Sequence, residues 1–176
     1  MNIRPADQIT GFRGVLVVVL VALSSRPATT SVAWIIVVIA IVAVVLDGVD
    51  GWVARRTGTA SAFGMRFDTE TDAALILVLA LLTWRHGKAG PWILGAGLLR
   101  YLFVAAGWVW PWMAGPLAPT LRGRVICVVQ IAALIVALAP IIVPPASTAI
   151  AAAGLGALVY SFLIDTRRLA GQRRTQ

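Results

Sequence analysis

Four aspartates in one short stretch of the chain have the residue type and the spacing of a metal site. Five of the seven acidic residues lie between positions 47 and 72. Four of these form what is called the acidic cluster below: Asp47, Asp50, Asp68 and Asp72. An apolar run ends directly before Asp47, and another begins directly after Asp72. Because carboxylates at the edge of hydrocarbon are costly, they are expected to serve a function, and their obvious partner is a divalent metal.

The spacing within the acidic cluster places each pair of aspartates on one face of a helix. The first pair is three residues apart and the second pair is four residues apart. Residues at these separations are neighbours on a helix surface. Small residues continue the two faces: Gly51 and Ala54 after the first pair, and Gly64 before the second. Such small side chains allow a ligand to approach the backbone closely.

A short connection should bring the two pairs together. Residues 56–63 include Gly58, Thr59 and Ser61, a turn-like composition that predicts two antiparallel helix ends. Four carboxylates a few ångströms apart repel one another, and hard divalent cations relieve this repulsion. All-oxygen ligands favour Mg²⁺, Mn²⁺ or Ca²⁺. Two ions would suit in-line phosphoryl transfer.

Arg55 lies next to the acidic cluster and is expected to hold a phosphate or a pyrophosphate. The alternative is that the stretch is a solvated, charged helix–loop–helix at the membrane surface, balanced by Arg55, Arg56 and Arg66. Four acids at helical spacing beside Gly and Ala favour the metal site over this alternative.

The elements that must position the acidic cluster are membrane-spanning helices. The chain has 60% hydrophobic and 12% charged residues, and its mean hydropathy is +0.90, whereas soluble domains are about a quarter charged. Apolar segments lie at 9–23, 31–46, 73–84, 91–113, 125–143 and 147–164. At roughly 20 residues per span, we expect an all-α integral membrane protein with six transmembrane helices. They would form a single domain over residues 1–176.

The second and third helices are expected to continue into the acidic stretch, over 31–54 and 64–84. Each would then be a span with a polar end that protrudes into the membrane interface. Prolines stand in most of the breaks between apolar segments, where they end or bend helices.

Basic residues indicate how the chain is oriented in the membrane. Six spans place both termini on the side of the acidic cluster, and the other side holds only Arg26, Arg85 and Lys88. By the positive-inside rule, the termini and the acidic cluster are expected on the cytoplasmic side of the cell membrane. Topology thereby explains the net charge of +8, so we expect no nucleic-acid partner. Ser24-Ser25-Arg26 is a poor cleavage site, so the first apolar segment is expected to be a retained span.

The acidic stretch resembles the signature of a known family. From Asp47 to Asp72 the chain reads D-x2-D-G-x2-A-R-x8-G-x3-D-x3-D, which is similar to the signature of the CDP-alcohol phosphatidyltransferases at every fixed position. The resemblance includes six spans with the signature between the second and third, so it covers most of the chain. It implies an enzyme of phospholipid biosynthesis. Such an enzyme transfers a substituted phosphate (phosphatidyl) group from a CDP-linked lipid, usually CDP-diacylglycerol, to an alcohol and releases CMP.

The same resemblance implies roles for individual residues. The four aspartates of the acidic cluster would hold Mg²⁺ or Mn²⁺, with two ions in all. Asp72 would also be the general base that takes the proton of the acceptor hydroxyl. The residues that would line or closely approach the cytidine-diphosphate group are Gly48, Gly51, Ala54, Arg55 and Gly64. The family resemblance also implies a homodimer.

A second, shorter resemblance concerns the N-terminal residues. Residues 7–13, Asp-Gln-Ile-Thr-Gly-Phe-Arg, resemble the stretch before the first span in phosphatidylglycerophosphate-synthase-like members of the family. Those members carry Asn where this chain has Asp7. The resemblance implies that Thr10 and Arg13 reach the nucleotide or its phosphates. The alternative is an amphipathic helix start at the membrane interface.

Basic residues of later segments are candidates for binding the acceptor. Arg100 lies within the fourth apolar segment, so it is expected to hold the acceptor's phosphate or to pair with the acidic cluster. Arg122 and Arg124 are expected at the cytoplasmic end of the fifth span, where they form an anion pocket or serve topology alone. These basic residues favour an anionic acceptor. The compact chain and the N-terminal resemblance favour glycerol 3-phosphate, and inositol phosphate or another alcohol stays open. A cation transporter is the alternative from another class, although its acids would lie nearer the bilayer midplane.

The remaining candidate residues are expected to have structural roles. Glycines within the spans are expected to serve helix packing: Gly95, Gly97, Gly154 and Gly156. Asp165 is expected to pair with one of the arginines that follow it. His86, on the predicted exterior side, is assigned no catalytic role.

Overall fold

The computed structural model describes residues 5–57, 62–110 and 121–173, and all the regular structure within these ranges is helical. The described helices are α1 (Pro5–Leu23), α2 (Thr30–Thr57), α3 (Ala62–Arg85), η1 (Pro91–Leu94), α4 (Gly95–Val109), α5 (Leu121–Leu138) and α6 (Ala146–Arg173). The all-α prediction is thus confirmed for the part of the chain that the structure describes.

Several described helices have the length and composition of membrane spans. Four segments qualify within the described residues: Thr30–Val49, Pro91–Val109, Leu121–Leu138 and Ala146–Gly171. The shorter apolar helix Gly11–Leu23 belongs to α1. Large apolar side chains such as Val18, Val38 and Leu102 are exposed on the outer faces, as expected where lipid is the solvent. These features support a multi-pass membrane protein, while six spans and cytoplasmic termini stay predictions.

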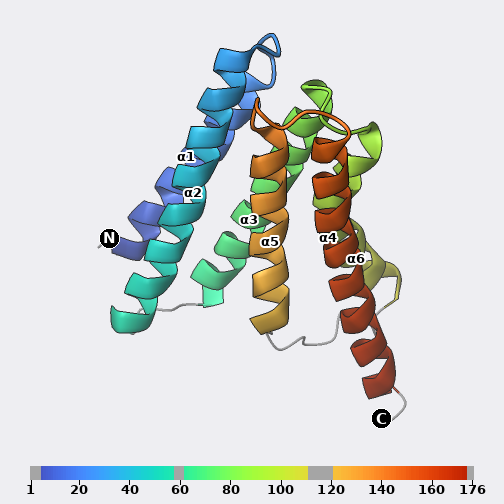
Figure 1. Cartoon of the computed structure of the whole chain (residues 1–176). Coiled ribbons are helices and arrows are strands. Elements are labelled where there is room, and N and C mark those ends of the chain that lie inside the picture. Colours follow the sequence, from blue (N-terminus) through green and yellow to red (C-terminus); the bar gives the residue numbers. More distant parts are fainter. Residues whose placement is uncertain (1–4, 58–61, 111–120, 174–176) are drawn as a thin grey trace.

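The helices form a bundle with α3 in its interior. α1 packs on α2, α5 packs on α6, and α3 contacts α1, α4 and α5. At one end of the bundle lie the start of α1, the end of α2 and the start of α3 (Figure 1). The start of α5 and the end of α6 lie at this end too, and the α1–α2 and α5–α6 connections lie at the opposite end. The predicted antiparallel arrangement of the second and third helices is therefore present.

Helix lengths follow the sequence prediction for α2 and α3, which both continue past their apolar segments into the acidic stretch. The prediction is wrong at the end of α5, which stops at Leu138 and not at Val143. Pro140 explains this early end, because proline disfavours helical geometry in the residue before it. α6 extends to Arg173, nine residues beyond its predicted apolar segment.

Two glycines allow helices to approach closely, as predicted. A Cβ added to Gly97 of α4 would lie 2.4 Å from the Cα of Leu77 in α3. A Cβ added to Gly154 of α6 would lie 2.7 Å from Gln130 Oε1 in α5. By contrast, a Cβ at Gly95 or Gly156 would meet no atom within 4 Å. Gly97 therefore helps to set the position of α3, the helix that carries half of the acidic cluster.

Candidate active site

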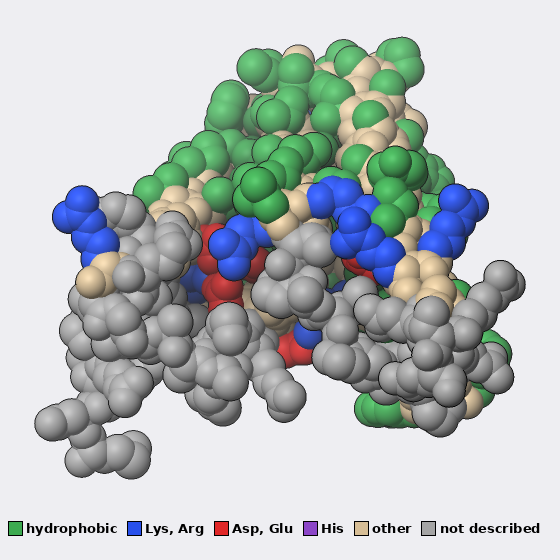
Figure 2. All heavy atoms as spheres, turned by 90° about the horizontal axis from the view of Figure 1, so that it is seen from below, with side chains coloured by type: hydrophobic (Ala, Val, Ile, Leu, Met, Phe, Trp, Pro, Cys, Tyr) green, Lys and Arg blue, Asp and Glu red, His purple; other side chains and the backbone are tan. Residues whose placement is uncertain are grey.

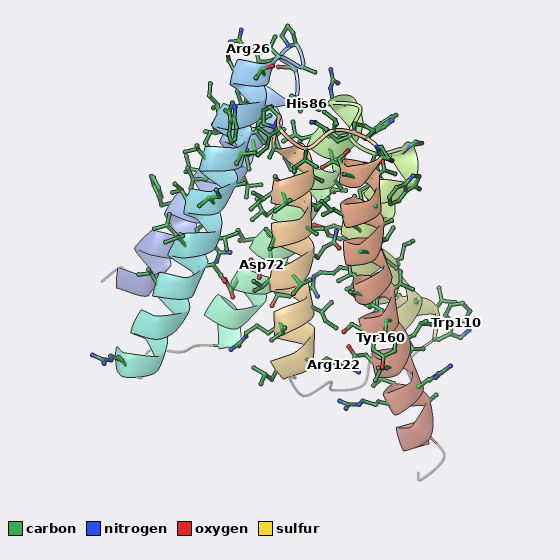
Figure 3. The ribbon with its side chains drawn as sticks, viewed as in Figure 1. Arg26, Asp72, His86, Trp110, Arg122 and Tyr160 are labelled. Atoms are coloured by element: carbon green, nitrogen blue, oxygen red, sulfur yellow. The ribbon has the colours of Figure 1, made fainter. Side chains whose placement is uncertain are left out.

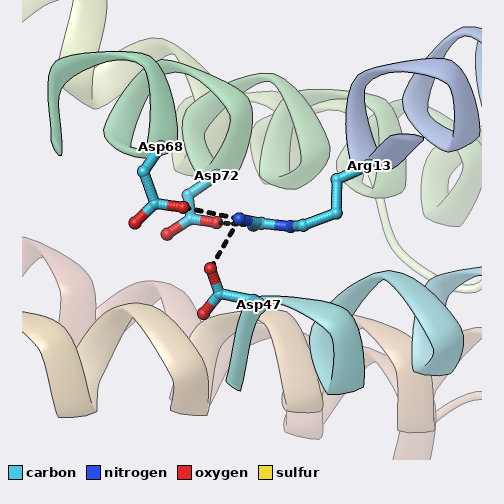
Figure 4. A network of polar contacts seen from close by, with 4 residues as sticks. All are labelled: Arg13, Asp47, Asp68 and Asp72. Atoms are coloured by element: carbon cyan, nitrogen blue, oxygen red, sulfur yellow. Dashed lines mark hydrogen bonds and ion pairs between the residues drawn. The ribbon is translucent and has the colours of Figure 1, made fainter. Parts of the chain in front are cut away.

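Three aspartates of the acidic cluster converge between α2 and α3. Asp47 comes from α2, and Asp68 and Asp72 come from successive turns of α3 (Figure 4). Each offers one carboxylate oxygen, and these oxygens all lie within 4.8 Å of one another. The side chains are half-buried, with Asp72 the least exposed at 22%. The helical spacing that the sequence suggested has therefore brought these three carboxylates together, while the side chain of Asp50 lies outside the described residues.

Arg13 of α1 lies at the centre of these three carboxylates. Its Nη1 is 2.6 Å from Asp47 Oδ1 and 2.5 Å from Asp68 Oδ1. Its Nη2 donates a hydrogen bond to Asp72 Oδ1 at 2.6 Å. The Arg13 side chain is 1% exposed, and its Nε is buried without a hydrogen-bond partner among the described residues.

This contact was not foreseen from the sequence, which suggested that Arg13 reaches a nucleotide or its phosphates. The available signal was the position of Arg13 at the beginning of an apolar run. A basic residue at such a depth in a membrane protein generally has an acidic partner, and the acidic cluster is the largest group of acids in the chain.

The charges of the site leave it receptive to a further cation. Three carboxylates face one guanidinium, so negative charge exceeds positive charge among the described side chains. Each carboxylate has lone pairs on two oxygens, and such hard oxygen donors suit Mg²⁺ or Mn²⁺. The residues present therefore fit a divalent metal.

The site opens toward the end of the bundle at which α2 ends and α3 begins. Figure 2 views this end and shows Asp and Glu side chains in its middle, with Lys and Arg side chains around them. Hydrophobic side chains cover the part of the molecule beyond. Charged side chains thus gather at this end, and the apolar surface beyond is left to lipid.

The residues predicted to line a nucleotide are only partly described. Gly48 is exposed on α2, and a Cβ there would meet no atom within 4 Å, so the space beside it is open. Gly51, one turn after Asp47, is half-buried. The remaining predicted residues belong to α1, α2 or α3, and their side chains lie outside the described residues: Thr10, Ala54, Arg55 and Gly64.

The arginines predicted for the acceptor are paired with acids on neighbouring helices. Arg100 of α4 forms an ion pair with Glu70 of α3. Glu70 lies between Asp68 and Asp72 in sequence but does not belong to the acidic cluster. The sequence predicted that Arg100 holds the acceptor's phosphate or pairs with the acidic cluster. Among the described contacts, its acidic partner is Glu70 and not a residue of that cluster.

Arg122, at the start of α5, forms an ion pair with Asp165 of α6. Among the described residues, Asp165 thus pairs with this arginine and not with one that follows it in α6. α5 and α6 are antiparallel neighbours, so the beginning of α5 lies beside the last turns of α6. Arg124 is exposed at the same end of α5.

His86 lies just after α3, at the end of the bundle opposite to Arg122 and well away from Asp72 (Figure 3). Burial lowers the pKa of its imidazole, and the nearby Lys88 and Arg85 lower it further. This placement agrees with assigning no catalytic role to His86.

Comparison with known protein families gives a match over most of the chain. The family model of the CDP-alcohol phosphatidyltransferases matches residues 4–162. The match includes Arg13, the whole acidic cluster, Arg100 and Arg122. No solved structure matches the chain.

Proposed function

Because the chain belongs to the CDP-alcohol phosphatidyltransferase family, an enzyme family that transfers substituted phosphate groups, we propose that it acts on a CDP-linked lipid such as CDP-diacylglycerol. The phosphatidyl group would pass to an alcohol at the cytoplasmic face of the cell membrane, and CMP would be released. The observation that carries the proposal is that carboxylate oxygens of Asp47, Asp68 and Asp72 lie within 4.8 Å of one another.

The acidic cluster is proposed to hold two divalent ions, Mg²⁺ or Mn²⁺, with Asp50 as the fourth ligand. When bound, such ions neutralise the pyrophosphate of the donor and the phosphate of the departing CMP. The carboxylates come from α2 and α3, whose positions are set by packing. The metal site would therefore orient the donor's phosphates before the reaction.

Asp72 is proposed as the general base. It is the least exposed of the three described carboxylates, and its Oδ1 faces the rest of the cluster, which leaves Oδ2 for the acceptor. The acceptor hydroxyl would give its proton to Asp72 while its oxygen bonds to the lipid-linked phosphorus. The bond from that phosphorus to the bridging oxygen would break, and the electron pair would leave with CMP. No covalent enzyme intermediate is needed.

The donor's cytidine diphosphate is proposed to lie along the small residues of α2 and α3. The open space beside Gly48 supports this placement. The small side chains of Gly51, Ala54 and Gly64 would let the nucleotide approach the helix backbones closely. Arg55, Thr10 and Arg13 would contact the nucleotide or its phosphates.

The acceptor is proposed to be anionic, with glycerol 3-phosphate as the first candidate and inositol phosphate as the alternative. The supporting observations are that Arg100 and Arg122 lie on α4 and α5, the helices that pack on α3, and that Arg124 is exposed on α5. A phosphate would have to compete with Glu70 and Asp165 for the first two of these arginines. A homodimer is proposed from the family resemblance.

The experiment is an assay of CMP release. The purified protein in nanodiscs is given CDP-diacylglycerol, Mg²⁺ or Mn²⁺ and one alcohol at a time, with a chelated sample as control. CMP should appear with at least one alcohol, should require the metal, and should accompany an equal amount of the new phospholipid. The proposal fails if no alcohol yields CMP. If liposomes that contain the protein then take up Mn²⁺, the transporter reading is supported instead.

A further inference from the structure

We propose that Arg13 is a resident counterion of the acidic cluster and competes with divalent ions for the carboxylates of Asp47, Asp68 and Asp72. In the metal-free enzyme Arg13 would neutralise part of the cluster, and it would withdraw when ions bind. This inference rests on the proposed metal site and adds a step to it, because the ions must displace a side chain before the donor can bind.

The geometry of the contacts places the two kinds of cation in competition for the same oxygens. Both terminal nitrogens of Arg13 lie 2.5–2.6 Å from Oδ1 atoms of the three aspartates. A Mg²⁺ ion needs oxygens at about 2.0–2.1 Å in near-ideal octahedral geometry. An ion held by the same oxygens would therefore lie beside the guanidinium, where two positive charges repel strongly in a partly buried site.

The burial of Arg13 shows that its charge depends on the carboxylates. The side chain is 1% exposed, so water does not solvate the guanidinium, and a buried charge is stable only when it is paired. Conversely, three carboxylates without Arg13 or an ion would repel one another. Each partner thus stabilises the other in the metal-free state, and the need for Arg13 disappears once divalent ions take its place.

Arg13 is nevertheless not fully satisfied in this position. Its Nε is buried without a hydrogen-bond partner among the described residues, and an unpaired buried donor is unfavourable. Leaving the cluster would release this unpaired donor, and the fork of donors would then be free for the phosphates of the donor lipid.

The test is a titration of the full-length protein in nanodiscs with Mn²⁺ alone, followed by the spin-resonance signal of free Mn²⁺. The Arg13→Gln variant should bind Mn²⁺ about tenfold more tightly than wild type, the scale of one hydrogen bond to a charged group. Its metal-free form should melt at a lower temperature, and Mn²⁺ should raise its melting temperature more than it raises that of wild type. Arg13→Lys keeps the charge without the fork and should bind Mn²⁺ with an intermediate affinity.

Arg85→Gln is the control, because it also removes one positive charge, from an exposed side chain at the end of α3 that is remote from the acidic cluster. It should change Mn²⁺ affinity much less than Arg13→Gln does. The inference is overturned if Arg13→Gln binds Mn²⁺ no more tightly than wild type. If that variant does not fold, Arg13→Lys is used in its place, and the inference is overturned if Arg13→Lys binds Mn²⁺ no more tightly than wild type. A failure of the metal site itself gives another result: wild type and Asp72→Asn would then bind Mn²⁺ equally weakly.

Discussion

Arg13 Nη2 donates a hydrogen bond to Asp72 Oδ1 at 2.6 Å, across 59 positions of the sequence. This contact joins α1 to the helix that carries half of the acidic cluster. Because Arg13 also contacts Asp47 of α2, one side chain ties three helices together at the candidate active site. The position of α1 is therefore part of the site, although the fixed residues of the family signature all lie in α2 and α3.

Asp72→Asn should abolish most of the turnover, while donor binding measured at saturating Mn²⁺ should stay nearly unchanged. The amide has nearly the same size as the carboxylate but cannot accept the acceptor's proton, and loss of a general base costs about 10²–10⁴-fold in rate. CMP release and the binding of a CDP-linked lipid would be measured on the same preparation.

Glu70→Gln is the control for this change, because Glu70 lies on the same helix but outside the acidic cluster and is half exposed. Its rate should stay within a few-fold of wild type. A rate for Asp72→Asn that equals the rate for Glu70→Gln would contradict the assignment of Asp72 as the base.

Arg122→Gln should raise the KM for an anionic acceptor by about tenfold, the scale of one hydrogen bond to a charged group. The KM for the CDP-linked donor should not change. Steady-state kinetics with glycerol 3-phosphate and then with inositol phosphate would measure the effect.

Asp165→Asn separates acceptor binding from a structural role of the same ion pair. It removes the pair between Arg122 and Asp165 but keeps the arginine, so the KM for the acceptor should stay equal or fall. If both variants raise this KM equally, the ion pair matters for structure and Arg122 does not bind the acceptor.

Gly97→Ala should destabilise the bundle by about 1–3 kcal/mol, the usual cost of overpacking. The new methyl group would lie 2.4 Å from the Cα of Leu77, so α4 would have to move away from α3. Gly95→Ala is the matched control two residues earlier, where a Cβ has open space. It should be neutral or stabilising by up to about 1 kcal/mol, because alanine favours a helix over glycine. Thermal unfolding of both variants in the same detergent checks the order.

His86→Gln should leave the pH profile of CMP release unchanged, because His86 is remote from Asp72 (Figure 3). Stability should respond differently. The pKa of His86 is lowered in the folded protein, so the unfolded chain binds the proton more readily. The contribution of neutral His86 to stability is complete above its ordinary pKa of about 6.5 and is lost as the pH falls through the lower folded value. Melting temperatures of wild type should therefore drop more steeply below about pH 6.5 than those of the variant.

Features that depend on local geometry could be predicted from residue types and their spacing. Residues three or four apart share a helix face whatever the helix packs against, so the pairs Asp47–Asp50 and Asp68–Asp72 could be assigned to two helices. The turn-like composition of residues 56–63 predicted antiparallel helices, and the convergence of Asp47 with Asp68 and Asp72 followed from that prediction. The fixed spacing of the signature also indicated the family that residues 4–162 match.

Which cation faces which acid depends instead on how the helices pack. Arg13 with the acidic cluster, Arg100 with Glu70, and Arg122 with Asp165 each join different helices. Sequence spacing carries no information on such pairs, because they depend on which helices are neighbours and on the rotation of each helix about its axis. The buried faces of α1, α3 and α5 set these rotations through packing, and packing placed Arg13 among the aspartates.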